Sequence, residues 1–152
     1  MIVFIGLQAT GKSSFYRERF EETHELVSKD QFPSARRPQV RQMRMLKEAL
    51  GAGRSVVVDN TNATREDRAV LIEAAKGHGA TVTGYYFESK VEESLRRNQA
   101  REGRSRVPEV AIYSTIKVLA RPMLKEGFDR LFHVRLAAEG GFAVTDWIEE
   151  DP

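Results

Sequence analysis

The sequence contains no cysteine among its 152 residues. Disulfide bonds, thiolate metal ligands and a cysteine nucleophile are therefore excluded. Long apolar runs are also missing, because no stretch approaches the roughly 20 residues of a membrane-spanning helix. The first apolar run is short and has no basic region before it, so it does not resemble a signal peptide. We therefore expect a cytoplasmic protein with no membrane partner, and the sequence leaves its oligomeric state open.

The sequence also carries little net charge, since its 24 Lys and Arg residues are nearly balanced by 22 Asp and Glu, which gives a formal charge of +2. This balance does not by itself indicate nucleic-acid binding. Hydrophobic residues make up 41% and charged residues 30% of the chain, which suits a packed core and a solvated surface. The length predicts one domain over residues 1–152.

A phosphate-binding motif stands near the start of the chain, where residues 6–13 match the P-loop pattern G-x-x-x-x-G-K-[ST]. The apolar run 2–5 before it predicts a buried strand, and residues 14–20 after it predict a helix. In this context the loop N–H groups face a triphosphate, the lysine reaches the β- and γ-phosphates, and the serine hydroxyl ligates Mg²⁺. We therefore predict that ATP and Mg²⁺ bind at Gly6, Leu7, Gln8, Ala9, Thr10, Gly11, Lys12, Ser13 and Ser14.

Strand and helix patterns alternate along the rest of the chain. We expect strands at residues 25–28, 54–59, 81–87 and 131–136, and helices at 39–50, 64–76, 89–101 and 108–119. This alternation predicts an α/β fold, namely the P-loop NTPase three-layer α/β/α architecture with a parallel sheet of about five strands and a helical lid, as in adenylate kinase. The tail at about residues 137–152 is expected to add an edge strand near 142–144.

Polar residues follow two of the predicted strands. In parallel sheets, ligands bind beyond the carboxyl ends of the strands, and these positions hold Asp30, Asp59, Asn60 and Asn62. A kinase needs a carboxylate that orients the acceptor hydroxyl and takes its proton, and Asp30 is a candidate for that base or is a solvated turn residue. Asp59 is a candidate Mg²⁺ ligand, and the two asparagines are candidates for substrate contacts, although all three residues also favour turns.

A first group of arginines lies in residues 96–106. Arg97 and Arg101 are four residues apart and share one helix face. Arginines in such a position stabilise the charge that develops on a transferring phosphoryl group. With Gly103 as a flexible point, we expect a lid at about residues 93–107 that closes over ATP. The alternative is a solvated basic face that pairs with the nearby glutamates.

A second group of basic residues follows shortly after Asp30 and comprises Arg36, Arg37, Arg41, Arg44 and Lys47. Such a group suits an anionic acceptor, for example a nucleic-acid backbone. An ordinary solvated helix face explains the same residues equally well.

Taken together, these motifs resemble the 5′-hydroxyl polynucleotide kinase family, the kinase domains of phage and animal end-healing enzymes. The resemblance extends over about residues 1–136 and is carried by residues 6–13, 28–30, 58–62, 97–101, 107–108 and 126–128. It implies an ATP-dependent kinase that transfers the γ-phosphate to the 5′-hydroxyl of a nucleic acid, in nucleic-acid repair. No phosphatase or ligase module accompanies the motifs.

The resemblance also implies roles for single residues. It makes Asp30 the general base, Arg101 the lid arginine on the transferring phosphate and Arg97 a neighbour of the nucleotide. Lys12 is implied as the third catalytic residue, and Ser13 and Asp59 as the metal site. The acceptor contacts are then expected at Asp30, Arg36, Arg37, Arg41, Asp59, Asn60 and Asn62.

One position departs from the family pattern. Family members often carry an arginine three residues after the base, and this chain has Pro33 there. Two other functions therefore stay open: a P-loop kinase of a small molecule or sugar nucleotide, similar to the zeta toxins, and a nucleotide-dependent ATPase or RNA-binding switch.

Overall fold

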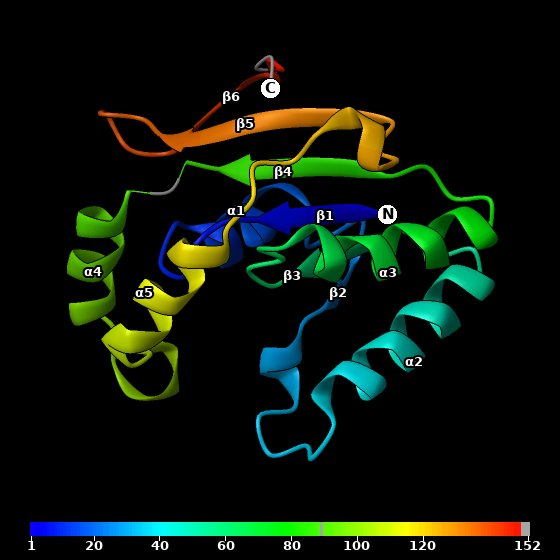
Figure 1. Ribbon diagram of the computed structural model, residues 1–152, viewed down its shortest axis with the longest axis horizontal. Coiled ribbons are helices and arrows are strands. Elements are labelled where there is room, and N and C mark those ends of the chain that lie inside the picture. The colour runs from blue at the N-terminus through cyan, green and yellow to red at the C-terminus, as the bar shows by residue number, and fades with distance from the viewer. Residues whose placement is uncertain (89, 150–152) are drawn as a thin grey trace.

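Six strands form one sheet in the order β2-β3-β1-β4-β5-β6 in the computed structural model, which describes residues 1–88 and 90–149 (Figure 1). The first five strands are parallel, and β6 pairs antiparallel with β5. The predicted parallel sheet is therefore confirmed, with β6 at the edge where the tail strand is expected. The strands are β1 Ile2–Ile5, β2 Glu25–Val27, β3 Val56–Asp59, β4 Thr83–Phe87, β5 Arg130–Leu136 and β6 Phe142–Asp146.

The helices follow the predicted order with small shifts at their ends. The α-helices are α1 Lys12–Arg19, α2 Pro38–Gly51, α3 Arg65–Gly77, α4 Val91–Gln99 and α5 Glu109–Val118, and the 3-10 helices are η1 Lys29–Gln31, η2 Gly103–Ser105 and η3 Leu124–Glu126. The expected helix start at Ser89 lies outside the described residues. The helix that we expect to reach Arg101 ends at Gln99. Within residues 1–88 and 90–149, no helix has the length and apolar character needed to cross a membrane.

Alternate residues of the central strands face two separate hydrophobic layers. On one face, Val3 and Ile5 of β1 pack with residues of α2 and α3, including Leu46 and Leu71. On the other face, Ile2 and Phe4 pack with Phe15 and Tyr16 of α1. Because strand side chains alternate between the faces and both faces are covered, the buried strands read as continuous apolar runs in the sequence. The predicted three-layer α/β/α architecture is confirmed.

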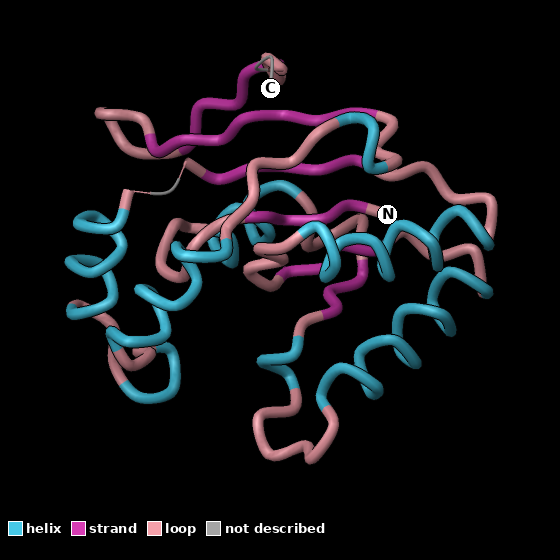
Figure 2. The backbone as a smooth tube through the Cα atoms, viewed as in Figure 1, coloured by secondary structure: helices cyan, strands magenta, loops and turns pink. Residues whose placement is uncertain are grey.

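Helices α4 and α5 stand beyond one end of the sheet. The arrowheads of β1 and β4 point toward these helices, and the tube in Figure 2 shows the same grouping (Figures 1 and 2). The two helices pack against each other, and residues 91–118, which comprise α4, η2 and α5, are called the α4–α5 arm below. The arm therefore lies at the carboxyl ends of the strands, where ligands bind in parallel sheets.

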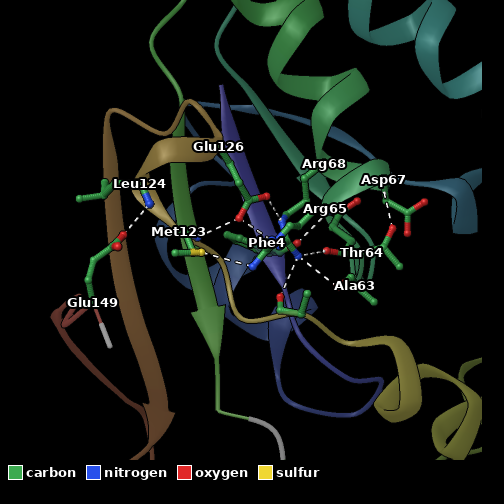
Figure 3. A network of polar contacts seen from close by, with 12 residues as sticks. Phe4, Ala63, Thr64, Arg65, Asp67, Arg68, Met123, Leu124, Glu126 and Glu149 are labelled. Atoms are coloured by element: carbon green, nitrogen blue, oxygen red, sulfur yellow. Dashed lines mark hydrogen bonds and ion pairs between the residues drawn. The ribbon is translucent and has the colours of Figure 1, made fainter. Parts of the chain in front are cut away.

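A fully buried guanidinium joins three segments of the chain (Figure 3). Arg68 on α3 forms a bidentate pair with Glu126, with N–O distances of 2.9 and 3.1 Å. Its Nη1 also donates to the carbonyl oxygens of Asn62, Ala63 and Ala120 at 3.0 to 3.1 Å. The charge is buried together with its partners, and each of the three guanidinium nitrogens donates at least one hydrogen bond. Arg68 thus fixes the loop after β3 to the segment that leaves α5.

We expect Arg68→Met to lower the free energy of unfolding by about 3–5 kcal/mol, because it leaves the Glu126 carboxylate and three carbonyls buried without their donor. Equilibrium urea unfolding measures this loss. The matched control is Arg54→Ala, which removes an exposed ion pair with Glu25 and should cost about 1 kcal/mol or less. If both variants lost the same free energy of unfolding, the buried ion pair would contribute no more to stability than the exposed one.

Candidate active site

The P-loop lies between β1 and α1, and the backbone at two of its glycines lies close to other parts of the chain. A Cβ on Gly6 would stand 3.0 Å from the carbonyl oxygen of Phe87. Gly11 has φ of 92° at the N-terminus of α1, and a Cβ there would stand 2.9 Å from the ring of Phe142. Glycine is therefore needed at both positions, for space at Gly6 and for space and backbone conformation at Gly11. The strand–loop–helix context that the motif requires is present.

The Lys12 side chain is folded into the P-loop. Its ammonium donates to the carbonyl oxygens of Gly6 and Leu7 and lies 3.4 Å from the Thr10 hydroxyl. Only 8% of the residue is exposed, and burial lowers the pKa of Lys12 to about 8, although Asp59 and Asp30 oppose this shift. The ammonium is thus held by loop carbonyls and is close to its titration range at neutral pH.

Ser13 in the first turn of α1 and Asp59 at the carboxyl end of β3 bring two side-chain oxygens together. The Ser13 hydroxyl donates to Asp59 Oδ2 at 3.0 Å. Burial raises the pKa of Asp59, and Lys12 and the Ser13 hydrogen bond counteract this effect. One hydroxyl and one carboxylate are the small protein share that Mg²⁺ takes when phosphates and water complete its octahedral shell. These two residues fit a magnesium site next to the P-loop.

The two asparagines after β3 hold the loop in place rather than pointing freely into solvent. Asn60 accepts from the Lys29 backbone N–H at 3.0 Å and donates to Gln42 of α2 at 2.6 Å. Asn62 has φ of 44° and donates to the Phe4 carbonyl at 2.8 Å. Asn60 therefore links the end of β3 to η1 and α2, and Asn62 links it to β1.

Asp30 lies in η1, directly after β2. Ser28 caps this short helix, because its hydroxyl accepts from the Asp30 backbone N–H at 3.2 Å while Gln31 bonds back to the Ser28 N–H at 2.9 Å. This reciprocal capping fixes the backbone of Asp30. The carboxylate is left exposed, so it is available for a ligand.

The α4–α5 arm brings two predicted arginines to the P-loop. Arg97 Nη1 lies 3.5 Å from the Ala9 carbonyl oxygen, and Arg101 bonds the Ser105 carbonyl at 3.0 Å. Burial lowers the pKa of Arg101, while Asp30 and Asp59 raise it. Asn98 closes the arm by two hydrogen bonds to the Val107 backbone. Arg101 is therefore held where both carboxylates act on it.

These groups surround one cavity of about 980 Å³. It is lined by P-loop residues, by Asp30 and Asp59, and by Arg101. The sequence predicts the two carboxylates at the ends of different strands and Arg101 on a helix, and the fold brings them together. The cavity is large enough for the phosphates of a nucleotide together with a second substrate.

A second cavity of about 690 Å³ also borders the P-loop. Thr10 and Arg97 line it, together with Glu88, Glu93 and the hairpin residues 134–139. Phe142 of the same hairpin packs on Phe15 with ring centroids 5.1 Å apart. The tail that the sequence leaves without a role thus supports α1 and forms a wall of this cavity.

Three of the basic residues that follow Asp30 do not lie in the cavity where we expect them to contact the acceptor. Arg36 and Arg37 are exposed in the segment before α2, and the Arg41 guanidinium lies 4.9 Å from the centre of the Phe32 ring. None of these three arginines is among the described residues that line the 980 Å³ cavity. Arg36 and Arg37 precede α2, and Arg41 lies in its first turns.

Three other cations line the larger cavity, and the sequence analysis does not identify them as acceptor contacts. They are Arg17, Lys29 and Arg104. Arg17 bonds the Ser14 hydroxyl one turn earlier in α1 at 3.2 Å, and Lys29 bonds Gln39 at 3.0 Å. The spacing of Arg17 from Ser14 and the position of Lys29 beside Asp30 are the signals that point to them.

Known proteins resemble this chain in sequence and in fold. The bifunctional polynucleotide phosphatase/kinase of Schizosaccharomyces pombe is 26% identical over 138 residues, which are 88% of this chain and 33% of that protein. This chain thus spans about a third of that relative's length.

Among solved structures, a sugar kinase from Janibacter has a TM-score of 0.65 at 21% identity and covers 87% of this chain and 83% of its own. Kti12 from Chaetomium thermophilum, in complex with ADP-AlF3, has a TM-score of 0.64 at 17% identity, with 88% of each chain covered. At these identities the likeness shows the fold, which is that of P-loop kinases.

The family model of the AAA domain AAA_33 matches residues 1–122. Most of the chain lies within this match, including the P-loop, both carboxylates and the α4–α5 arm. The protein therefore belongs to the AAA_33 family of AAA domains and has a kinase-like P-loop fold.

Proposed function

We propose that this protein is an ATP-dependent kinase that transfers the γ-phosphate of ATP to the 5′-hydroxyl end of a nucleic acid. One observation carries this proposal: the 980 Å³ cavity combines phosphate-binding groups with an exposed carboxylate, Asp30, on a separate strand end. An enzyme that only hydrolyses ATP needs to position a water molecule, whereas a kinase also needs room and a base for an acceptor. The ADP-AlF3 complex of Kti12 supports nucleotide binding at this loop.

In the proposed reaction, Asp30 takes the proton of the acceptor hydroxyl as its oxygen forms a bond to the γ-phosphorus. The bond from the γ-phosphorus to the β–γ bridging oxygen breaks, and ADP leaves with that oxygen. Lys12 and the P-loop N–H groups hold the phosphate oxygens, and Arg101 stabilises the charge on the transferring group. Ser13 and Asp59 would hold Mg²⁺, which when bound would neutralise further charge on the phosphates.

The α4–α5 arm is proposed to act as the lid that the sequence predicts at about residues 93–107. Arg97 and Arg101 both come from this arm: Arg97 donates to the Ala9 carbonyl of the P-loop, and Arg101 lines the same cavity as Asp30 and Asp59. Closing the arm would exclude water and complete the set of positive charges around the γ-phosphate. We place the nucleoside of ATP in the second cavity, beside Arg97.

Charge in the larger cavity supports an anionic acceptor. Arg17, Lys29 and Arg104 line it in addition to Lys12 and Arg101. Positive charge beyond that needed by ATP suits the phosphates that follow a 5′-hydroxyl terminus. Arg36, Arg37 and Arg41 would extend this track along α2. The S. pombe relative, which is named as a polynucleotide phosphatase/kinase, supports the same acceptor class.

A small-molecule acceptor is the second candidate. The sugar kinase from Janibacter is covered over 83% of its length, whereas the polynucleotide relative is covered over 33%. The proline at position 33 also removes the arginine that family members often use on the acceptor. A sugar or sugar nucleotide would occupy the same cavity beside Asp30.

The first test concerns the acceptor. Purified protein is supplied with ATP labelled at the γ-phosphate and with a 5′-hydroxyl oligonucleotide, a nucleoside, gluconate or a sugar nucleotide. We expect transfer to the oligonucleotide, and loss of transfer with retained ATP binding in Asp30→Asn, because the base contacts only the acceptor. Transfer to a small molecule with none to the oligonucleotide would refute the polynucleotide assignment and leave the kinase assignment standing.

We expect Arg101→Ala to lower kcat by about 1000-fold while the KM for ATP rises much less. An arginine that acts mainly in the transition state has this kinetic signature. Arg96→Ala is the control, since Arg96 is exposed on α4 of the same arm and lines neither cavity. A change confined to the KM for ATP would make Arg101 a ground-state nucleotide contact.

The pH profile tests the protonation of Lys12. Its pKa is lowered to about 8, so the ammonium that binds phosphate is lost as the pH rises through this value. The kcat/KM for ATP reports the free enzyme and should fall above about pH 8, whereas kcat reports the complex and should fall at higher pH. In Lys12→Arg, residual activity should lack this alkaline decline, because a guanidinium stays charged. A decline that persists in Lys12→Arg would belong to another group.

A further inference from the structure

Gln8, the third residue of the P-loop, reaches across to the α4–α5 arm. Its Nε2 donates to the Thr115 hydroxyl oxygen on α5 at 3.1 Å. The Thr115 hydroxyl in turn donates its single hydrogen to the Ala111 carbonyl at 2.8 Å. Since that hydroxyl oxygen is left only as an acceptor toward Gln8, the amide nitrogen must face Thr115. The orientation of the Gln8 amide is therefore fixed by the arm.

This orientation leaves the other end of the amide without a partner. Gln8 Oε1 is buried and accepts no hydrogen bond from the described residues. Ser94 Oγ and Trp147 Nε1 are also buried and unpaired, but neither residue is among those described as lining the 980 Å³ cavity, whereas Gln8 is. A buried acceptor that lacks a donor costs free energy, and a ligand that supplies the donor recovers it.

The other polar side chains of this loop are already engaged. The Thr10 hydroxyl donates to the Leu7 carbonyl at 2.9 Å, and Ser13 donates to Asp59. Phosphates are bound in a P-loop by backbone N–H groups and by the lysine, so Gln8 Oε1, which can only accept, has no role toward them. Gln8 lines the cavity, so a shift of its side chain toward the cavity would present the unpaired oxygen to the second substrate.

We propose that Gln8 is an acceptor-binding residue whose Oε1 accepts a hydrogen bond from an O–H or N–H of the 5′-terminal nucleotide. This inference rests on the proposed function and specifies which part of the acceptor is recognised. Because Thr115 anchors the same amide, the bond forms when the arm lies against the P-loop. An acceptor with a suitably placed donor therefore favours the arrangement in which Arg101 is at the site. The donor is a ribose 2′-hydroxyl or a base N–H.

The test compares steady-state kinetics of the wild type with Gln8→Ala and Gln8→Met, which keeps the length of the side chain without the amide. Three 5′-hydroxyl oligonucleotides are used, ending in a ribonucleotide, a deoxyribonucleotide or an abasic deoxyribose. Loss of one hydrogen bond should raise the KM for the acceptor about tenfold, with a smaller increase in the KM for ATP. If the donor is the 2′-hydroxyl, the effect is confined to the ribonucleotide end. If the donor is a base N–H, the KM increases for the ribonucleotide and deoxyribonucleotide ends and is unchanged for the abasic end.

Two controls separate this contact from structural damage. Thr115→Val removes the anchor but keeps Oε1, so it should raise the acceptor KM less than Gln8→Ala. Gln99→Ala removes a glutamine of the arm that does not line the larger cavity and bonds Glu109 instead, and its kinetics should match the wild type. ADP binding and urea unfolding confirm that each variant is folded.

The outcomes are distinct. If the wild type transfers phosphate to none of the oligonucleotides, the proposed function fails, and this inference fails with it. If the wild type transfers and both Gln8 variants keep its acceptor KM, only the inference is overturned. It is also overturned if the KM rises equally for all three ends, because no donor of the terminal nucleotide is then involved.

Discussion

The parallel pairing of β1 with β3 is the constraint on which the site depends. In this register Phe4 lies beside Asp59, and Ile5 is followed at once by the P-loop. Since parallel strands end at the same edge of a sheet, the phosphate-binding loop and the carboxylate meet there. The Ser13–Asp59 hydrogen bond and the bond from the Gly6 N–H to the Thr61 carbonyl at 3.0 Å both follow from this pairing. A different neighbour for β1 would separate the two halves of the site.

Buried polar groups then fix the loops that no sheet holds. Asn62 joins the loop after β3 to β1, and Arg68 joins the same loop to Ala120 at the end of the α4–α5 arm. Because the side-chain nitrogens of Asn62 and Arg68 donate to these buried carbonyls, the contacts restrict the loops to one arrangement. The base of the arm and the carboxylate loop therefore share one rigid support.

The charged groups of the cavity are destabilised by burial and stabilised by one another. Burial disfavours the charged forms of Lys12, Asp59 and Arg101, so it lowers the pKa of Lys12 and Arg101 and raises that of Asp59. Each of these charges is in turn stabilised by an opposite charge in the same set. A site of this kind is suited to receive the phosphates of a nucleotide, whose charge would be matched by Lys12, Arg101 and a metal ion.

The amino-acid sequence by itself determined the α/β architecture, the P-loop and the arrangement of elements along the chain. These features depend on local patterns, namely apolar periodicity, glycine positions and helix caps, which are readable without knowing the neighbours of a strand. It also identified Asp30 and Asp59 as candidates from their positions at strand ends. Arg101 was a candidate from a helix pattern, but the helix ends at Gln99 and Arg101 follows it. Only the tertiary structure decided which cations line the larger cavity: Lys29, Arg17 and Arg104 do, whereas Arg36, Arg37 and Arg41 do not. The contact between Gln8 and Thr115 was also decided there. Contacts between residues 107 positions apart depend on how the arm packs on the sheet, and no local pattern encodes that packing.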